Sequence, residues 1–397
     1  MNQFAQRVTH LEPEGAYAVL SRAQQLKAQG KNIIHFEIGQ PDFDTFPHIS
    51  LAGIRAISEG KTRYNPPAGL PELRAAIAST AGQQHGITID PEQVVIGPGA
   101  KPGLFFPTLA LVNPGDEVIF PDPGFPTYPA MIDIAGGIPI PVPLLEKNHF
   151  SLDLETFDRL INPRTKLIIL NSPANPTGGV IPIQDLTHLA EMAQEYHCWV
   201  MSDEIYARLT YDNRQVPSII SLPHMAEQTI LVDGFSKTYA MTGWRLGYAI
   251  MPAKLAQRVE LLMTHSIGCT ATFTQVAGIQ ALLGDQSMVD KVAEEYQRRR
   301  DRVVRGLNAI QGISCQIPQG AFYVFPNIKA LGIPSRQLAQ QLLDEAGVAV
   351  LPGDDFGKNG EGYLRLCYAV SMDEIDEGLK RISEFVGKLK NNNAINR

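Results

Sequence analysis

The sequence predicts an α/β protein: a large three-layer domain around a mostly parallel sheet, joined to a smaller α+β domain. Short apolar runs alternate with longer amphipathic stretches through the middle of the chain, which is the pattern of successive strands and helices. The apolar runs do not alternate with polar residues, which is typical of parallel strands buried on both faces. The C-terminal part instead begins with a long charged helical pattern that contains no strand.

Seven apolar runs are predicted as strands of the large sheet. They are Val94–Gly97, Glu117–Phe120, Ile138–Val142, Lys166–Asn171, Cys198–Ser202, Thr229–Asp233 and Leu246–Ile250. Helical patterns lie between several of them, for example over Ile183–Tyr196. This order of elements is the basis for the three-layer prediction.

The C-terminal part is predicted to fold as helix, strand, helix, strand, strand, helix. The segments are Val292–Ile310, Phe322–Phe325, Ser335–Ala346, Val348–Leu351, Tyr363–Tyr368 and Asp373–Leu389. A chain of 397 residues is too long for one core of average size. We therefore expect a large domain over residues 46–290 and a small domain formed by residues 1–45 together with 291–397.

Composition and charge exclude several classes of function. The chain has 34 basic and 41 acidic residues, a net charge of −7, which argues against a nucleic-acid partner. The run Arg298–Arg300 lies in a helical pattern and is interpreted as a solvated helix face. The N-terminus shows no apolar segment of an export signal, and the apolar runs are too short to cross a bilayer. We expect no membrane association.

The cysteines and histidines predict neither a disulfide scaffold nor a metal site. None of the four cysteines lies in a CxxC pair, which is typical of reduced thiols in a cytoplasmic protein. The nine histidines show no HExxH or similar spacing of metal ligands. The cysteines are Cys198, Cys269, Cys315 and Cys367.

Three segments with unusual residues follow predicted strands, where ligands bind in open α/β sheets. The first, Gly97–Gly103, precedes a helical run. Its glycines let the backbone approach a ligand, and the N–H groups of a helix start favour phosphate. A tight turn without a ligand also accounts for this segment when it is taken alone.

The other two segments carry polar and charged residues. Asn175 and Asp203 follow buried strands, where they serve either as caps and loop starters or as ligands of a cationic ring. Lys237 comes directly after the strand ending at Asp233. A partly desolvated lysine has a lowered pKa and can condense with a carbonyl. Arg245, around the next turn, is suited to bind a phosphate bidentately.

Together these segments resemble the class I and II aminotransferases, which are fold-type-I pyridoxal-phosphate enzymes similar to aspartate aminotransferase. The resemblance runs from Ile38–Phe43 to Arg365, nearly the whole chain. Its most specific motif is Ser236-Lys237 with Gly243-Trp244-Arg245-Leu246-Gly247. Asn175–Gly178, Ser202–Tyr206 and Tyr64–Arg74 follow the family order as well.

The resemblance implies that residues 46–290 bind pyridoxal 5′-phosphate. It implies that Lys237 forms the aldimine with the cofactor and moves the proton at the substrate Cα. Asp203 is the implied partner of the pyridine nitrogen, which keeps the ring electron-accepting. Tyr206 and Asn175 are implied as donors to the phenolate oxygen. The implied phosphate cradle consists of Arg245, Ser236 and the backbone around Gly99, Ala100 and Lys101.

The remaining roles concern the substrate and a second subunit. Phe125 is implied to stack on the cofactor ring, with core packing as the alternative. Arg365, a cation inside an apolar strand, is implied to bind the substrate carboxylate, with Gly39 and Asn175 beside it. Tyr64 is implied to reach the phosphate of a neighbouring subunit, so a homodimer with shared sites is expected. Residues 270–272 are expected near that interface.

Two positions bear on the branch of the family. Many relatives carry a serine where this chain has Gly234, although other branches have glycine there too. Lys101 occupies a position where a lysine reads the distal carboxylate of aspartate or glutamate in some bacterial relatives. A lysine that contributes only its backbone is the alternative.

The leading hypothesis is a ping-pong transamination from an L-amino acid to a 2-oxo acid, with 2-oxoglutarate as the expected acceptor. Elimination, cyclisation or C–S lysis on the same fold also begin with Cα deprotonation and remain the alternative. A transcription regulator of this fold is disfavoured, because Gly39–Asp42 lies too near the N-terminus for a preceding DNA-binding domain. The sequence leaves the donor amino acid open.

Overall fold

The computed structural model describes residues 4–9 and 11–395. Its centre is an eight-stranded sheet in the order β2-β9-β8-β7-β6-β3-β4-β5. The strands are β2 Val94–Gly97, β3 Glu117–Asp122, β4 Ile138–Leu145, β5 Ser151–Leu152, β6 Thr165–Asn171, β7 Trp199–Asp203, β8 Thr229–Gly234 and β9 Gly247–Ile250. Every strand predicted for the large sheet is present, with ends shifted by a few residues at most, and β5 is an addition.

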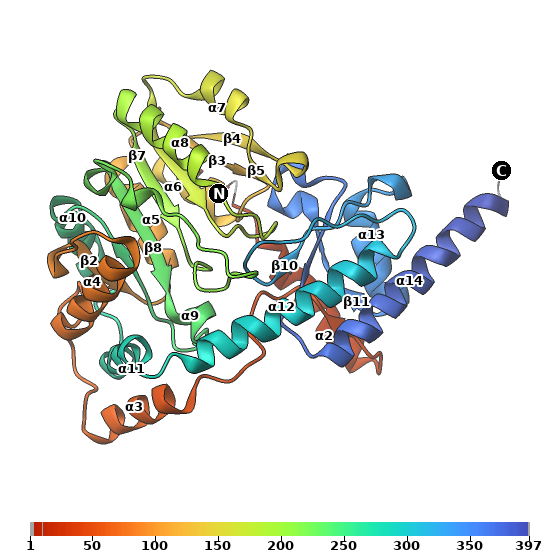
Figure 1. The fold of residues 1–397 in the computed structure, drawn as a ribbon, viewed down its shortest axis with the longest axis horizontal. Coiled ribbons are helices and arrows are strands. Elements are labelled where there is room, and N and C mark those ends of the chain that lie inside the picture. The colour runs from red at the N-terminus through yellow and green to blue at the C-terminus, as the bar shows by residue number, and fades with distance from the viewer. Residues whose placement is uncertain (1–3, 10, 396–397) are drawn as a thin grey trace.

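Helices surround this sheet (Figure 1). They are α3 Pro47–Ser58, α4 Pro71–His85, α5 Lys101–Leu111, α6 Thr127–Ala135, α7 Leu154–Leu160, α8 Ile183–Glu195, α9 Phe235–Thr238, α10 Ala253–Thr264 and α11 Thr272–Leu283. Alternate residues of a strand face opposite layers. Leu167 and Ile169 of β6 pack with α5, α6 and α10, whereas Ile168 and Leu170 pack with α7 and α8. The three-layer α/β prediction is confirmed.

The sheet is mostly parallel, as predicted. β4, β3, β6, β7 and β8 run parallel to one another in sheet order. β9 is antiparallel to both β8 and β2, and β5 is antiparallel to β4. The carboxyl ends of the central parallel strands therefore share one edge, where ligands bind in sheets of this kind.

A smaller sheet joins segments that are far apart in the sequence. β13 (Leu364–Cys367) lies between β10 (Tyr323–Val324) and β12 (Leu351–Pro352) and is antiparallel to both. β1 (Ile34–His35) pairs in parallel with β11 (Val348–Ala349). The single strand predicted over Val348–Leu351 is thus split between β11 and β12. The helices that pack with these strands are α2 Gly15–Ala28, α12 Ser287–Asn308, α13 Ser335–Gln341 and α14 Met372–Ile395. α1 Gln6–Thr9 instead contacts α6 beside the large sheet.

The interpretation of Arg298–Arg300 as a solvated face of α12 is wrong for two of its three residues. Arg299 is 6% exposed and Arg300 is 3% exposed. Arg299 pairs with Asp42, and Arg300 pairs with Asp212. Buried guanidinium groups require such partners. Because both carboxylates come from distant segments, the charged run itself gives no sign of them.

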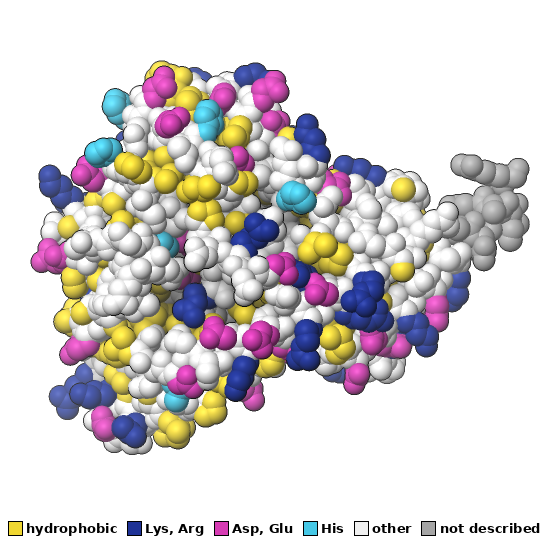
Figure 2. Space-filling view, in the orientation of Figure 1, with side chains coloured by type: hydrophobic (Ala, Val, Ile, Leu, Met, Phe, Trp, Pro, Cys, Tyr) yellow, Lys and Arg dark blue, Asp and Glu magenta, His cyan; other side chains and the backbone are white. Residues whose placement is uncertain are grey.

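Two general features of the molecule bear on its environment. Within residues 4–9 and 11–395, no helix is long and apolar enough to cross a membrane. All four cysteines are free thiols, and three of them are buried. Figure 2 shows basic and acidic side chains interspersed over one face of the molecule.

Candidate active site

The polar segments singled out in the sequence meet at the carboxyl ends of the parallel strands. Asn175 lies in the loop after β6, and Asp203 ends β7. β8 leads directly into the short helix α9, which carries Lys237. Arg365 of β13 reaches the same edge, since its Nη1 donates to Oδ1 of Asn175 at 3.4 Å.

Lys237 lies at the centre of this site. Its Nζ atom donates a hydrogen bond of 2.6 Å to the backbone oxygen of Gly39. The same atom lies 5.6 Å from the ring centre of Phe322 and 5.9 Å from that of Tyr206. Burial lowers the pKa of the Lys237 amine to about 8. Near neutral pH this shift raises the fraction of neutral, nucleophilic amine.

Asp203 is a buried acid with two hydrogen bonds. The hydroxyl of Tyr128 donates to its Oδ2 at 2.7 Å, and the backbone N–H of Ile205 donates to its Oδ1 at 3.4 Å. Burial raises the pKa of the Asp203 carboxyl to about 6, and these hydrogen bonds oppose the shift. No basic side chain of the described residues forms an ion pair with it. A cationic ligand atom would supply that partner.

Arg245 and the turn after β2 form a cradle in which the turn has no room for side chains. The two Nη atoms of Arg245 donate to the backbone oxygens of Thr242 and Pro98 at 3.0 and 3.2 Å. A Cβ atom at Gly99, whose φ is +90°, would lie 2.2 Å from Nη2 of Arg245. A Cβ atom at Gly247 would lie 2.4 Å from the carbonyl carbon of Gly99. Glycine is required at both positions.

Two further residues predicted for the phosphate cradle lie at or near the start of a helix. Ala100 is the N-cap residue of α5, so the first N–H groups of that helix follow it. Ser236 precedes Lys237 in α9 and is 8% exposed. A cation beside the N-terminus of α5 is an arrangement that binds phosphate.

Arg365 is a buried cation that forms no ion pair with a carboxylate of the described residues. Its Nη2 donates to the backbone oxygen of Glu37, and its Nη1 donates to Oδ1 of Asn175 at 3.4 Å. Its Nε has no hydrogen-bond partner in the described part of the chain. The guanidinium lies over the rings of Tyr323 and Phe356, with Cζ 4.6 and 5.0 Å from their centres. The residue is therefore available for an anionic ligand.

Lys101 and Phe125 lie next to each other, and Phe125 contacts Tyr128, the hydrogen-bond partner of Asp203. Nζ of Lys101 forms an ion pair with Glu14 and lies 5.3 Å from the ring centre of Phe125. Phe125 packs edge-on against Tyr128, with ring centres 5.7 Å apart. The Lys101 side chain is therefore held by a carboxylate of the chain itself.

Tyr64 contacts little of its own chain, since it is 99% exposed. The next residue is anchored, because Nδ2 of Asn65 donates to the backbone oxygen of Thr270 at 2.7 Å and to Oγ1 of Thr272 at 3.0 Å. Thr270 lines one pocket together with Arg245. Tyr64 is therefore exposed, although the next residue is hydrogen-bonded close to the cradle formed by Arg245.

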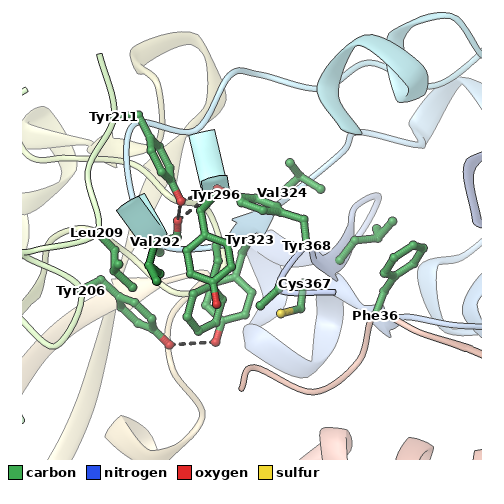
Figure 3. Packing of buried hydrophobic residues seen from close by; sticks show 14 of the residues in the cluster. Phe36, Tyr206, Leu209, Tyr211, Val292, Tyr296, Tyr323, Val324, Cys367 and Tyr368 are labelled. Atoms are coloured by element: carbon green, nitrogen blue, oxygen red, sulfur yellow. Dashed lines mark hydrogen bonds between the residues drawn. The ribbon is translucent and has the colours of Figure 1, made fainter. Parts of the chain in front are cut away.

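Two tyrosines belong to this site although the sequence analysis did not include them. Tyr128 donates to Asp203, and the hydroxyl of Tyr323 lies 2.8 Å from that of Tyr206 (Figure 3). Tyr128 closely follows Phe125 in the sequence, and this proximity could have identified it as a site residue. Tyr323 gave no local signal, because its partners lie far away in the sequence.

In the ranges that the structure describes, no group of three or more His, Cys, Asp and Glu side chains is placed to hold a metal ion.

The family model described as Aminotransferase class I and II matches residues 31–382. An aspartate aminotransferase of Pyrococcus abyssi is 40% identical over 363 residues, which cover 91% of this chain and 93% of that protein. An aromatic-amino-acid aminotransferase 2 of Thermococcus litoralis is 38% identical, covering 91% and 94%. A solved structure of aspartate aminotransferase from Thermus thermophilus with maleate has a TM-score of 0.93 at 38% identity, covering 97% and 100%.

These matches extend across both the large and the small sheet. Their family uses pyridoxal 5′-phosphate to move an amino group between an amino acid and a 2-oxo acid. The relatives are named as aminotransferases. Their names support transamination rather than elimination, cyclisation or C–S lysis. The chain belongs to the class I and II aminotransferases and is a pyridoxal-phosphate-dependent transaminase.

Proposed function

We propose that the amino group passes from an L-amino acid to 2-oxoglutarate at a site whose reactive amine is Lys237. One observation carries this proposal: Nζ of Lys237 donates a hydrogen bond of 2.6 Å to the backbone oxygen of Gly39. Burial in addition lowers the pKa of this amine to about 8. An amine in this state can condense with a carbonyl and can also carry a proton.

The residues around Lys237 fit pyridoxal phosphate. When bound, this cofactor supplies an aldehyde and a ring that withdraws electron density from the substrate Cα. The cradle that a Cβ atom at Gly99 would fill suits its phosphate, and the buried Asp203 suits its ring nitrogen. In this proposal Arg245, Ser236, Gly99, Ala100 and the backbone of Lys101 hold the phosphate.

Three side chains are proposed to orient the ring. Asp203 keeps the ring nitrogen protonated through a buried ion pair, and Tyr206 with Asn175 donates to the ring oxygen. Tyr206 is 3% exposed and Asn175 is 8% exposed, so water competes little for these hydrogen bonds. Phe125 is proposed to cover one face of the ring.

The substrate is proposed to bind through its α-carboxylate. Arg365 supplies the cation, since its Nε lacks a partner among the described residues. Asn175 and Gly39 flank this position, because Asn175 bonds to Arg365 and Gly39 bonds to Lys237. With the cofactor bound, Nζ of Lys237 would take the proton from the substrate Cα and deliver it to the cofactor carbon that carried the aldehyde. Orientation by the carboxylate clamp is the main contribution of the chain here.

A homodimer with shared active sites is part of the proposal. Tyr64 is 99% exposed, while Asn65 holds its segment to Thr270 beside the Arg245 pocket. In a two-fold dimer such a side chain can complete the phosphate site of the partner subunit. Residues 270–272 would then lie close to the interface.

We further propose that residues 46–290 are the cofactor-binding domain and that residues 1–45 with 291–397 are the small domain. The pairing of β1 with β11 supports the assignment of the N-terminal segment to the small domain. A cytoplasmic location is consistent with four free cysteine thiols.

The test is a half-reaction on the loaded enzyme. Aspartate, glutamate, alanine and phenylalanine are added singly, without a keto acid, while the absorbance of the cofactor is followed. We expect the aldehyde-form band to disappear with one equivalent of keto acid formed per site. A band that persists while keto acid and ammonia accumulate over many turnovers would contradict the proposal.

A further inference from the structure

The register of the small sheet fixes the position of Tyr323. Tyr323 on β10 lies opposite Cys367 of β13, and residues opposite each other in an antiparallel pair project to the same face. Arg365 is two positions from Cys367 on the same strand, so its side chain projects to that face as well. Two distant segments thereby bring Tyr323 and Arg365 together.

The ring of Tyr323 supports the guanidinium of Arg365. Cζ of Arg365 lies 4.6 Å from the ring centre, which is within the range of a cation–π contact. Tyr323 is 1% exposed and Arg365 is 4% exposed, so solvent screens the contact little. The ring thereby limits the positions that the guanidinium can take, which favours one orientation of its N–H groups for a carboxylate ligand.

The hydroxyl of Tyr323 reaches the other end of the site. It lies 2.8 Å from the hydroxyl of Tyr206, as the dashed line in Figure 3 marks. A Cβ atom at Gly39 would lie 2.0 Å from the Tyr323 oxygen, so glycine at position 39 makes room for this hydroxyl. The backbone oxygen of Gly39 in turn binds Lys237. Tyr323 therefore contacts residues at both ends of the site.

We propose that Tyr323 is a positioning residue for both ends: its hydroxyl donates to Tyr206, and its ring orients Arg365 for the substrate carboxylate. This inference rests on the proposed function and extends it to a residue outside the family motifs identified in the sequence. A tyrosine hydroxyl has one proton to donate. When the proton of Tyr206 is directed at the ring oxygen of the cofactor, Tyr323 must be the donor of the pair.

Donation of the hydrogen bond from Tyr323 to Tyr206 has a measurable consequence. A hydrogen bond donated to Tyr206 polarises its O–H and makes it a stronger donor. Stronger donation to the ring oxygen stabilises the negative charge there, which favours the deprotonated form of the loaded enzyme. The hydroxyl of Tyr323 therefore lowers the pH midpoint at which the absorbance of the bound cofactor changes.

Two substitutions separate the hydroxyl from the ring. Tyr323→Phe is expected to raise the absorbance midpoint by about 0.3–0.5 pH units and to leave the KM for the amino acid within about twofold. Tyr323→Leu is expected to show the same rise together with about a tenfold increase in KM, because Arg365 loses its support.

Tyr368→Phe is the matched control. Its hydroxyl is also buried, and its oxygen lies 3.1 Å from the hydroxyl of Tyr211 and 3.0 Å from the backbone oxygen of Ala321. Urea unfolding of the cofactor-free variants measures the loss of stability in each case. We expect Tyr368→Phe to lower stability at least as much as Tyr323→Phe while its absorbance midpoint stays at the wild-type value.

Tyr206→Phe serves as the reference variant, and its midpoint should rise further than that of Tyr323→Phe. A rise with Tyr206→Phe but none with Tyr323→Phe overturns the inference and leaves the proposed function standing. Unchanged midpoints in both overturn the inference along with the role of Tyr206. Equal rises in Tyr323→Phe and Tyr368→Phe also overturn it, because packing alone would then explain the shift.

Discussion

Nη1 of Arg299 lies 2.8 Å from each carboxylate oxygen of Asp42. Asp42 belongs to the same short segment as Gly39, whose backbone oxygen binds Lys237. The ion pair thus fastens α12 to the segment that contacts the reactive lysine. An ion pair between a buried arginine and a partly exposed aspartate thus contributes to the geometry of the site.

Removing the Arg299 side chain should lower the stability of the protein. Arg299→Ala removes a buried guanidinium and leaves the partly exposed Asp42 carboxylate without its ion-pair partner. We expect the free energy of unfolding to fall by about 1–3 kcal/mol. Urea denaturation of the cofactor-free protein measures this. Arg298→Ala is the control, since Arg298 is exposed on the same helix and should change stability by less than about 0.5 kcal/mol. Equal losses of unfolding free energy in Arg299→Ala and Arg298→Ala would show that the ion pair of Arg299 with Asp42 does not stabilise the fold.

A buried acid outside the reacting atoms predicts a pH dependence of stability. Glu204 accepts hydrogen bonds from the hydroxyls of Ser202 and Ser218, and burial raises the pKa of its carboxyl from 4.5 to about 7. The folded protein therefore binds more protons than the unfolded chain between these two values. The contribution of Glu204 to stability falls as pH rises through this window and stays low above it.

Glu204→Gln removes that titration. Relative to wild type, the variant should gain about 2–3 kcal/mol of unfolding free energy between pH 5 and pH 8. Urea denaturation of the cofactor-free proteins at both pH values gives the difference. Glu227→Gln, on an exposed residue, is the control. Parallel stability curves for wild type and Glu204→Gln would refute the prediction.

Arg365→Lys tests the carboxylate site. The lysine keeps the positive charge but cannot present two parallel N–H groups to a carboxylate. We expect the KM for the amino acid to rise about 100-fold, with the cofactor absorbance of the loaded enzyme unchanged. Arg336→Lys is the control, because Arg336 pairs with Asp354 at an exposed position. A KM that stays at the wild-type value would exclude Arg365 from substrate binding.

Mixed dimers test whether Tyr64 acts across subunits. Tyr64→Ala and Lys237→Ala are each expected to be strongly impaired alone. Co-refolding the two should restore about a quarter of wild-type activity, because one site of each mixed dimer then has both residues intact. Steady-state assays before and after mixing measure the gain. Activity that never exceeds the sum of the separate variants would place Tyr64 outside the partner's site.

The sequence predicted the architecture well because buried parallel strands are legible as uninterrupted apolar runs. β6 and β7 differ from their predicted ranges by one residue at each shifted end. The small sheet was harder, since β11 and β12 are two residues each and were read as one strand. Such short strands are specified by their partners rather than by their own pattern.

The positions of candidate residues could be predicted where a residue lies at, or soon after, the end of a strand. Asp203 at the end of β7 and Lys237 shortly after β8 are of this kind. Arg299 and Tyr323 are different, because burial and strand register give them their partners from distant segments. A charged run and a lone tyrosine look the same in sequence whether they are solvated or buried.

The central claim is that Lys237 binds the cofactor covalently, and borohydride reduction of the loaded enzyme tests it most directly. Borohydride fixes the reversible carbon–nitrogen link between a lysine and a bound aldehyde, and peptide mapping by mass spectrometry then locates the added mass. We predict the modification on the peptide that contains Lys237, and its loss in Lys237→Ala. Modification of Lys101 or another lysine, with Lys237 unmodified, would contradict the account.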